Sequence, residues 1–145
     1  MSYFVDIAYN NMNKYGEELC GDKVEIIRND DRNIIVMADG LGSGVKANIL
    51  STLTSKIAAT MLKNGASIVE TVDTIIHTLP VCKVRELAYS TFTIVEIYED
   101  GSVYTAEFDN PPIFLVRNGN LVNIEKKEIQ VLKKFQPAFL IYRAI

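Results

Sequence analysis

The residues best suited to chemistry form one acidic, glycine-rich stretch, Asp39-Gly40-Leu41-Gly42-Ser43-Gly44. Its three glycines leave the backbone open to a ligand and permit positive φ angles. A carboxylate beside an open backbone favours a hard divalent cation, because such ions take oxygen ligands from aspartate and from peptide carbonyls. The stretch therefore indicates a metal site.

Two nucleotide-binding interpretations fit this stretch less well. A P-loop requires Gly-Lys-Ser/Thr, whereas Gly44 is followed by Val45 and Lys46. A dinucleotide fingerprint requires a third glycine where Val45 stands, and an acidic ribose partner about 20 residues later is also lacking. Asp39 would repel a bare pyrophosphate. Nucleotide binding at this loop is thus the weakest of the alternatives.

A second carboxylate is expected at the same place in the fold. Residues 23–28 and 33–38 are rich in β-branched residues, and the polar turn Asn29–Arg32 predicts that they form an antiparallel hairpin. The start of one strand then lies beside the end of the other, which brings Asp22 to Asp39. Two such carboxylates would resist ionising together, and one or two divalent ions between them would remove that cost. The alternatives are a turn-capping role for Asp22 and a helix N-cap role for Asp39.

Two helices are expected after the glycines. Residues 45–63 place a stripe of apolar side chains at three- and four-residue spacing, namely Leu50, Leu53, Ile57 and Met61. Asn64-Gly65 then supplies a stop, and Ser67 with Glu70 forms a capping box for a second helix. Pro80 ends that helix, whose expected buried face consists of Ile68, Val72, Ile75, Ile76 and Leu79.

The flanking segments predict strands, so the chain as a whole is expected to be α+β. The expected strands are residues 3–9, 89–98, 103–108, 113–117, 121–124 and 139–142. Asp100-Gly101 and Asn118-Gly119 are typical of tight hairpin turns, and Asp109-Asn110 with its two following prolines predicts a turn that interrupts the ladder.

Composition limits the class of protein. The 145 residues suit a single domain spanning residues 1–145, and a net charge of -3 argues against a nucleic-acid partner. Cys20 and Cys82 are too few for a disulfide framework, and His77, the single histidine, is expected on the surface near a helix end. The start of the chain is not typical of a secretory signal, and no apolar run reaches the ~20 residues of a membrane span. A cytoplasmic location is therefore expected.

These residues together resemble a known family. Gly21-Asp22, the stretch Asp39–Gly44 opening a helix, and Tyr89-Ser90-Thr91-Phe92 leading a strand are similar to the stage II sporulation protein E family. That family belongs to the metal-dependent Ser/Thr phosphatases of the protein phosphatase 2C class. The resemblance covers approximately residues 16–130. It implies an antiparallel β-sandwich flanked by helices, with a binuclear Mn²⁺ or Mg²⁺ centre at one end.

The resemblance also implies individual roles. Asp39 matches the family's metal-bridging aspartate, Gly40 its backbone carbonyl ligand, and Asp22 its upstream metal-binding aspartate. Asp22 and Asp39 are therefore the candidate catalytic residues, and all three are candidate metal ligands. A metal-activated water would attack the phosphorus of phosphoserine or phosphothreonine in line. The implied partner is a phosphorylated regulatory protein of the anti-anti-sigma type, and a homodimer is compatible with the sequence.

One departure from the family pattern affects the expected activity. The family's later Ser-Asp-Gly segment and its final aspartate-bearing loop have no counterpart before Ile145. The chain is therefore expected to be a C-terminally incomplete phosphatase domain. The alternative is a degenerate relative that binds a phosphorylated partner through the glycine loop without hydrolysing it. In either case we expect the isolated chain to bind divalent metal weakly and to turn over slowly or not at all.

Overall fold

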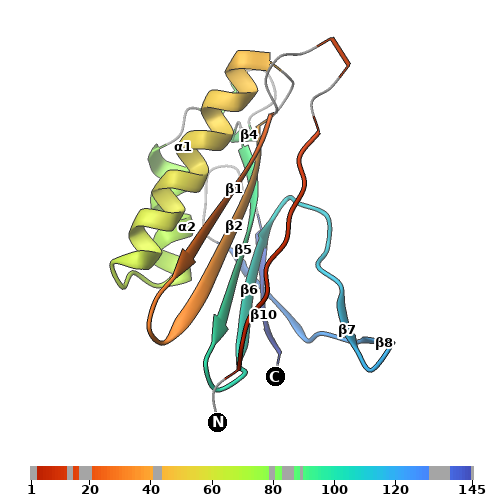
Figure 1. Cartoon of the computed structure of the whole chain (residues 1–145). Coiled ribbons are helices and arrows are strands. Elements are labelled where there is room, and N and C mark those ends of the chain that lie inside the picture. Colours follow the sequence, from red (N-terminus) through yellow and green to blue (C-terminus); the bar gives the residue numbers. More distant parts are fainter. Residues whose placement is uncertain are drawn as a thin grey trace.

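The main feature of the computed structural model is a six-stranded antiparallel sheet in the order β1-β2-β5-β6-β10-β9 (Figure 1). The structure describes residues 3–12, 15–16, 21–40, 44–78, 81–82, 87–88, 90–130 and 138–144. The strands of this sheet are β1 (Asp22–Arg28), β2 (Arg32–Gly40), β5 (Ser90–Tyr98), β6 (Val103–Phe108), β9 (Lys126–Gln130) and β10 (Ala138–Ala144). Two short hairpins complete the strands: β3 (Val81–Cys82) with β4 (Leu87–Ala88), and β7 (Leu115–Arg117) with β8 (Asn120–Val122).

Two helices, α1 (Gly44–Lys63) and α2 (Ile68–Thr78), cover one face of this sheet (Figure 1). Alternate side chains of β2, β5 and β6 point at the helices because side chains along a strand alternate between its two faces. The buried core lies in this layer and consists of Ile34, Val36, Ala38, Ala58, Leu62, Val72, Ile75, Ile76, Phe92, Ile94, Ala106 and Phe108. The predicted α+β class is confirmed. Among the described residues, neither helix combines the length and the apolar character that a membrane span requires.

The sheet face opposite the helices is called the distal face below. The N-terminal segment 3–12 runs along this side of the sheet as an extended chain (Figure 1). Its carbonyl at Val5 accepts a hydrogen bond of 3.1 Å from Nη1 of Arg28, and its Tyr3 N–H donates to the Glu99 carbonyl. The predicted strand at residues 3–9 is wrong, because this segment lies over the sheet and does not join a ladder at its edge.

The buried face of α1 differs from the predicted apolar stripe. Leu53 is 45% exposed, and Val45 and Ile49 are more exposed still. The residues turned toward the sheet are mostly small: Ala47, Leu50, Ser51, Thr54, Ser55, Ala58, Ala59 and Leu62. Small side chains let a helix approach a sheet closely, so backbone proximity decides which face is buried here, whereas the spacing of the largest apolar residues does not.

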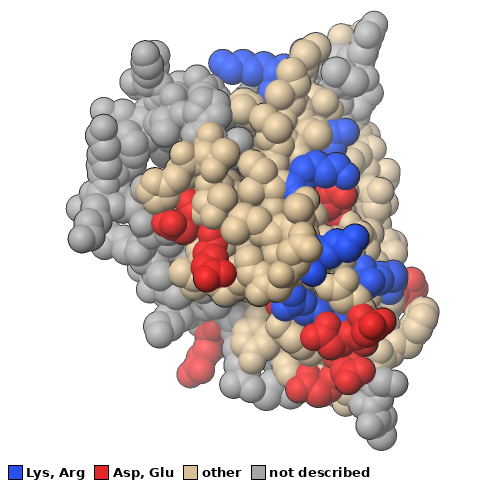
Figure 2. Space-filling model, turned by 90° about the vertical axis from the view of Figure 1, so that its left-hand side faces the viewer, with Lys and Arg blue, Asp and Glu red and all other residues tan. Residues whose placement is uncertain are grey.

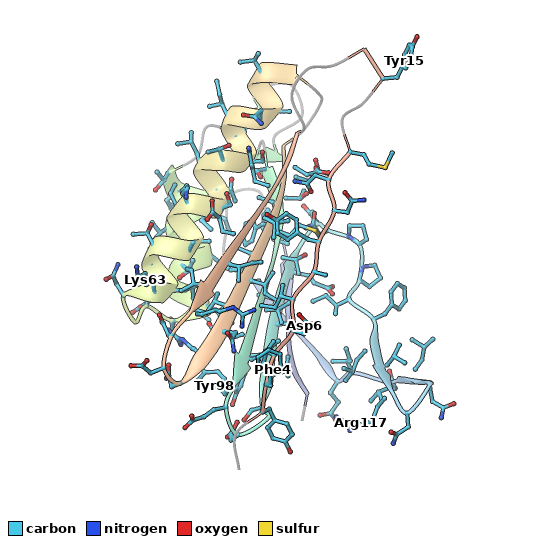
Figure 3. The ribbon with its side chains drawn as sticks, viewed as in Figure 1. Phe4, Asp6, Tyr15, Lys63, Tyr98 and Arg117 are labelled. Atoms are coloured by element: carbon cyan, nitrogen blue, oxygen red, sulfur yellow. The ribbon has the colours of Figure 1, made fainter. Side chains whose placement is uncertain are left out.

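Arg32 fixes the C-terminal end of α1 to the sheet. Its Nη2 donates a 2.6 Å hydrogen bond to the Leu62 carbonyl, and its Nη1 donates to Oε2 of Glu96 at 3.2 Å and to the Tyr98 hydroxyl at 3.1 Å. The Leu62 carbonyl belongs to the last turn of the helix, where carbonyls have no partner within the helix. Lys63, the residue after Leu62, marks this C-terminal end of α1 in Figure 3. An arginine on the β1–β2 hairpin thus acts as a C-terminal cap.

The local signals at turns and helix starts are confirmed. Ser67 Oγ accepts from the Glu70 N–H at 3.1 Å, and the Glu70 carboxylate accepts from the Ser67 N–H at 3.2 Å, so the capping box is formed. Asn118 and Gly119 both have positive φ, as a tight hairpin turn requires. The strand expected at residues 139–142 is present within β10, whereas β9 was not predicted. Leu79 and Pro80 lie outside the described residues.

Thr105 offers a test of how the distal face is packed. It is 3% exposed, and its hydroxyl has no hydrogen-bond partner among the described residues. Since valine has the same shape without the buried hydroxyl, we expect Thr105→Val to stabilise the fold by about 1 kcal/mol. Urea unfolding followed by circular dichroism measures this change. A loss of stability would show that the hydroxyl is hydrogen-bonded in solution.

Candidate metal centre

Asp22 and Asp39 are direct cross-strand partners at the end of the β1–β2 ladder. The Gly40 N–H donates to the Gly21 carbonyl at 3.0 Å, so the two aspartates form a non-hydrogen-bonded pair. Cα atoms in such pairs lie about 4.5 Å apart, and their side chains project to the same face. That face is the distal one, because the neighbouring Ala38 points into the core beneath the helices. The convergence predicted from the hairpin is therefore present in the structure.

Burial and the neighbouring carboxyl group together shift the pKa of Asp39. The pKa of Asp39 is raised from 3.8 to about 6, first because partial burial disfavours its charged form. A hydrogen bond with Asp22 and the negative charge of Asp22 raise the pKa further. A cation placed between two such close carboxyl groups would remove the repulsion between their negative charges.

Gly40 allows α1 to begin immediately beside these carboxyl groups. A Cβ atom at this position would lie 2.0 Å from the Ala47 carbonyl oxygen, in the first turn of the helix. Gly40 is not among the glycines with positive φ, so space is what requires glycine here. The backbone is also held on the other side, where Ser90 Oγ donates to the Asp39 carbonyl at 3.1 Å. The end of β2 is thus fixed by both neighbouring strands and by the helix.

The donor set suits a hydrated hard cation. Among the described residues, no group of three or more His, Cys, Asp or Glu side chains is placed to hold a metal ion. Two carboxylates remain, together with backbone carbonyls at the end of β2. Mg²⁺ is commonly bound through one or two carboxylates while it keeps several waters, so this pair fits such an ion. The other predicted features of the glycine stretch, Leu41 to Ser43, lie outside the described residues.

Sequence reasoning missed two polar residues next to the pair. Thr91 is the cross-strand partner of Asp39 on the β5 side, and its hydroxyl donates to Asn110 Oδ1 at 2.6 Å. The sequence pattern predicts only a turn role for Asn110. The polar side chain of Asn110 just before two prolines was the available signal in the sequence. The sequence does not indicate its partner, Thr91, because the two residues are 19 positions apart. His77 is exposed and contacts Asp73 four residues earlier, as expected for a surface position.

The charged side chains of the helix-covered face do not form a region of one sign. Figure 2 shows lysine and arginine side chains beside aspartate and glutamate side chains on this face. One ion pair among them joins the exposed Lys56 to the half-buried Glu25 at 3.0 Å. This mixed pattern differs from the basic surface typical of a nucleic-acid interface.

This chain is similar to one known protein family and to several solved structures. A family model described as stage II sporulation protein E matches residues 29–133. Among solved structures, the PP2C phosphatase domain of the cell fate determinant SpoIIE from Bacillus subtilis has a TM-score of 0.70 at 23% identity. RsbX in complex with magnesium has a TM-score of 0.58 at 22% identity. The RsbU and RsbW domains of a Mycobacterium tuberculosis protein have a TM-score of 0.55 at 20% identity. No curated protein gives a significant match.

The alignments cover a larger share of this chain than of the solved chains. The alignments cover 78%, 70% and 65% of this chain, in the same order. They cover only 33%, 48% and 26% of the three solved chains. The similarity establishes that this chain has the fold of the PP2C-type domains, and it spans less than half of each of these neighbours.

Proposed function

Because the chain belongs to the stage II sporulation protein E family, we propose that it is a metal-dependent phosphatase domain acting on phosphoserine or phosphothreonine. The observation that carries this proposal is the Asp22–Asp39 pair, two carboxyl groups in register at one sheet end with the pKa of Asp39 raised to about 6. Carboxyl groups placed so closely favour a shared Mn²⁺ or Mg²⁺ ion over two separate charges. The magnesium complex of RsbX supports this choice of metal.

Each residue of the site has a distinct task in this proposal. Asp22 and Asp39 would hold the ion, and the backbone carbonyl of Gly40 would complete the protein ligands. When bound, the ion supplies a water of lowered pKa for in-line attack on phosphorus and neutralises charge on the transferred group. Below the raised pKa of Asp39, its proton must leave before an ion enters, so metal binding in that pH range is coupled to deprotonation.

The proposed substrate is a phosphorylated regulatory protein, of the anti-anti-sigma type implied by the resemblance. The presence of RsbU and RsbW domains together in one of the similar structures supports a partner of this class. A second candidate function is binding of such a phosphorylated partner without hydrolysis. One finding favours it: among the described residues, no third Asp, Glu, His or Cys side chain joins the two carboxylates to form a larger metal-binding group.

Release of phosphate from a phosphoserine peptide tests the proposal. With saturating Mn²⁺ at pH 7.5, we expect slow turnover. EDTA should abolish it, because two carboxylates hold the ion weakly. Asp39→Asn should abolish it, whereas Asp6→Asn, the same change at an exposed position of the N-terminal segment, should not. Calorimetry distinguishes the phosphatase from the second candidate, a protein that binds its phosphorylated partner without hydrolysis. A chain that binds the phosphopeptide but neither binds Mn²⁺ nor releases phosphate would favour the second candidate.

A further inference from the structure

A row of polar residues continues from the carboxyl pair across the end of the distal face. Asp22 pairs with Asp39, and Asp39 pairs with Thr91, so the three positions lie side by side on three adjacent strands. Partners in an antiparallel sheet project to the same face, so the Thr91 side chain lies on the distal face next to Asp39. The turn after β6 brings Asn110 to the far side of Thr91, within hydrogen-bond distance.

The hydrogen bonds of Asn110 determine which way the Thr91 hydroxyl points. Thr91 Oγ1 lies 2.6 Å from Asn110 Oδ1, and Asn110 Nδ2 lies 2.9 Å from Thr93 Oγ1. The first distance is typical of an O–H···O bond and the second of an N–H···O bond, which agrees with this orientation of the amide. A threonine hydroxyl has one proton, and a carbonyl oxygen can only accept. Thr91 therefore gives its proton to Asn110 and keeps only lone pairs for other neighbours.

Asn110 is held firmly in its turn. Asp109 before it has a φ of 53°, and two prolines follow it. The loop is then attached to the distal face by Glu107, which is 4% exposed and accepts a 2.6 Å hydrogen bond from the Ile113 N–H. A buried carboxylate beneath a proline-containing turn leaves the amide of Asn110 little freedom to move.

We propose that Thr91 accepts a hydrogen bond from water bound to the cation held by Asp22 and Asp39, and that Asn110 is the positioning residue that keeps Thr91 an acceptor. The inference rests on the proposed function. With only two carboxylates, the ion keeps several waters, and each of them is a strong hydrogen-bond donor that needs an acceptor. Residues that support metal ligands in this way typically change metal affinity about 10- to 100-fold when they are replaced.

The test is the affinity for Mn²⁺, measured on the full chain from the electron paramagnetic resonance signal of the free ion. We expect Thr91→Val to raise the dissociation constant about tenfold, and Thr91→Ser to restore it to within about twofold of wild type. Asn110→Ala should also weaken binding. The double variant should be no weaker than Thr91→Val alone, because both changes remove the same hydrogen bond.

Thr105→Val is the matched control, since it removes a hydroxyl from the same face away from the carboxyl pair. It should leave Mn²⁺ affinity unchanged. Wild-type affinity in folded Thr91→Val would overturn this inference, as would a serine variant that binds no better than valine. If Thr91→Val does not fold, Asn110→Ala decides: unchanged affinity overturns the inference, and weakened affinity supports it. Absence of Mn²⁺ binding in the wild type, or unchanged binding in Asp39→Asn, would instead overturn the proposed function and this inference with it.

Discussion

Gly40→Ala is expected to destabilise the folded chain by roughly 3 kcal/mol or more and to remove binding of Mn²⁺. The new Cβ would lie 2.0 Å from the Ala47 carbonyl oxygen and within 3 Å of two further backbone atoms of Ala47. A backbone carbonyl cannot rotate away as a flexible side chain can, so the start of α1 must move. That movement would also shift Asp39, which directly precedes Gly40. Chemical denaturation and Mn²⁺ titration of the same sample measure both effects.

A second glycine serves as the control for this substitution. Gly119 has a φ of 78° and open space around it, so Gly119→Ala tests backbone strain without a steric clash. We expect it to cost about 1 kcal/mol and to leave Mn²⁺ affinity unchanged, because the β7–β8 turn lies away from the carboxyl pair. Equal losses of stability in the two variants would contradict the close approach of α1 to the end of β2.

Asp39→Asn should abolish Mn²⁺ binding and, at the same time, stabilise the metal-free chain at neutral pH. The folded pKa of Asp39, about 6, exceeds its ordinary value of 3.8. The folded state therefore binds this proton more tightly than the unfolded state does. The resulting stability is fully present below about pH 4 and is lost as the pH rises through 6. Asparagine carries no charge at any pH, so the variant does not lose that stability.

The expected gain for Asp39→Asn is about 1 kcal/mol at pH 7.5, after allowance for solvent screening at this partly exposed group, and close to zero at pH 4. Thermal unfolding at the two pH values measures it, with Asp6→Asn as the control for loss of one negative charge. Asp6 lies on the extended N-terminal segment (Figure 3). A variant less stable than wild type at pH 7.5 would show that a hydrogen-bond donor or a positive charge stabilises the Asp39 carboxylate in the folded chain.

The geometry of the carboxyl pair was predictable because it depends on local signals. Two β-rich runs joined by a short polar turn have one favoured register, and that register places Asp22 opposite Asp39. The capping box at Ser67 is equally local, since its two partners stand three residues apart. Features of this kind are determined by hydrogen bonds between near neighbours, which a sequence pattern records directly.

The remaining features depend on contacts between distant segments. The need for glycine at position 40 comes from Ala47 on the following helix, and the cap on α1 comes from Arg32, which is 30 residues before Leu62. The bond between Thr91 and Asn110 likewise depends on the pairing of β5 with β6. Leu53 was predicted to be buried and is exposed, because small residues face the sheet along α1. Apolar spacing alone does not determine how closely a helix approaches a sheet.

The central claim is that Asp22 and Asp39 share a divalent cation. The most direct measurement is an anomalous difference map from a crystal of the full chain grown with Mn²⁺ near pH 7.5, above the pKa of Asp39. We expect a manganese peak between the two carboxyl groups, within coordination distance of both. A map with Mn²⁺ bound elsewhere on the chain, or with no manganese between the two carboxyl groups at saturating Mn²⁺, would contradict it.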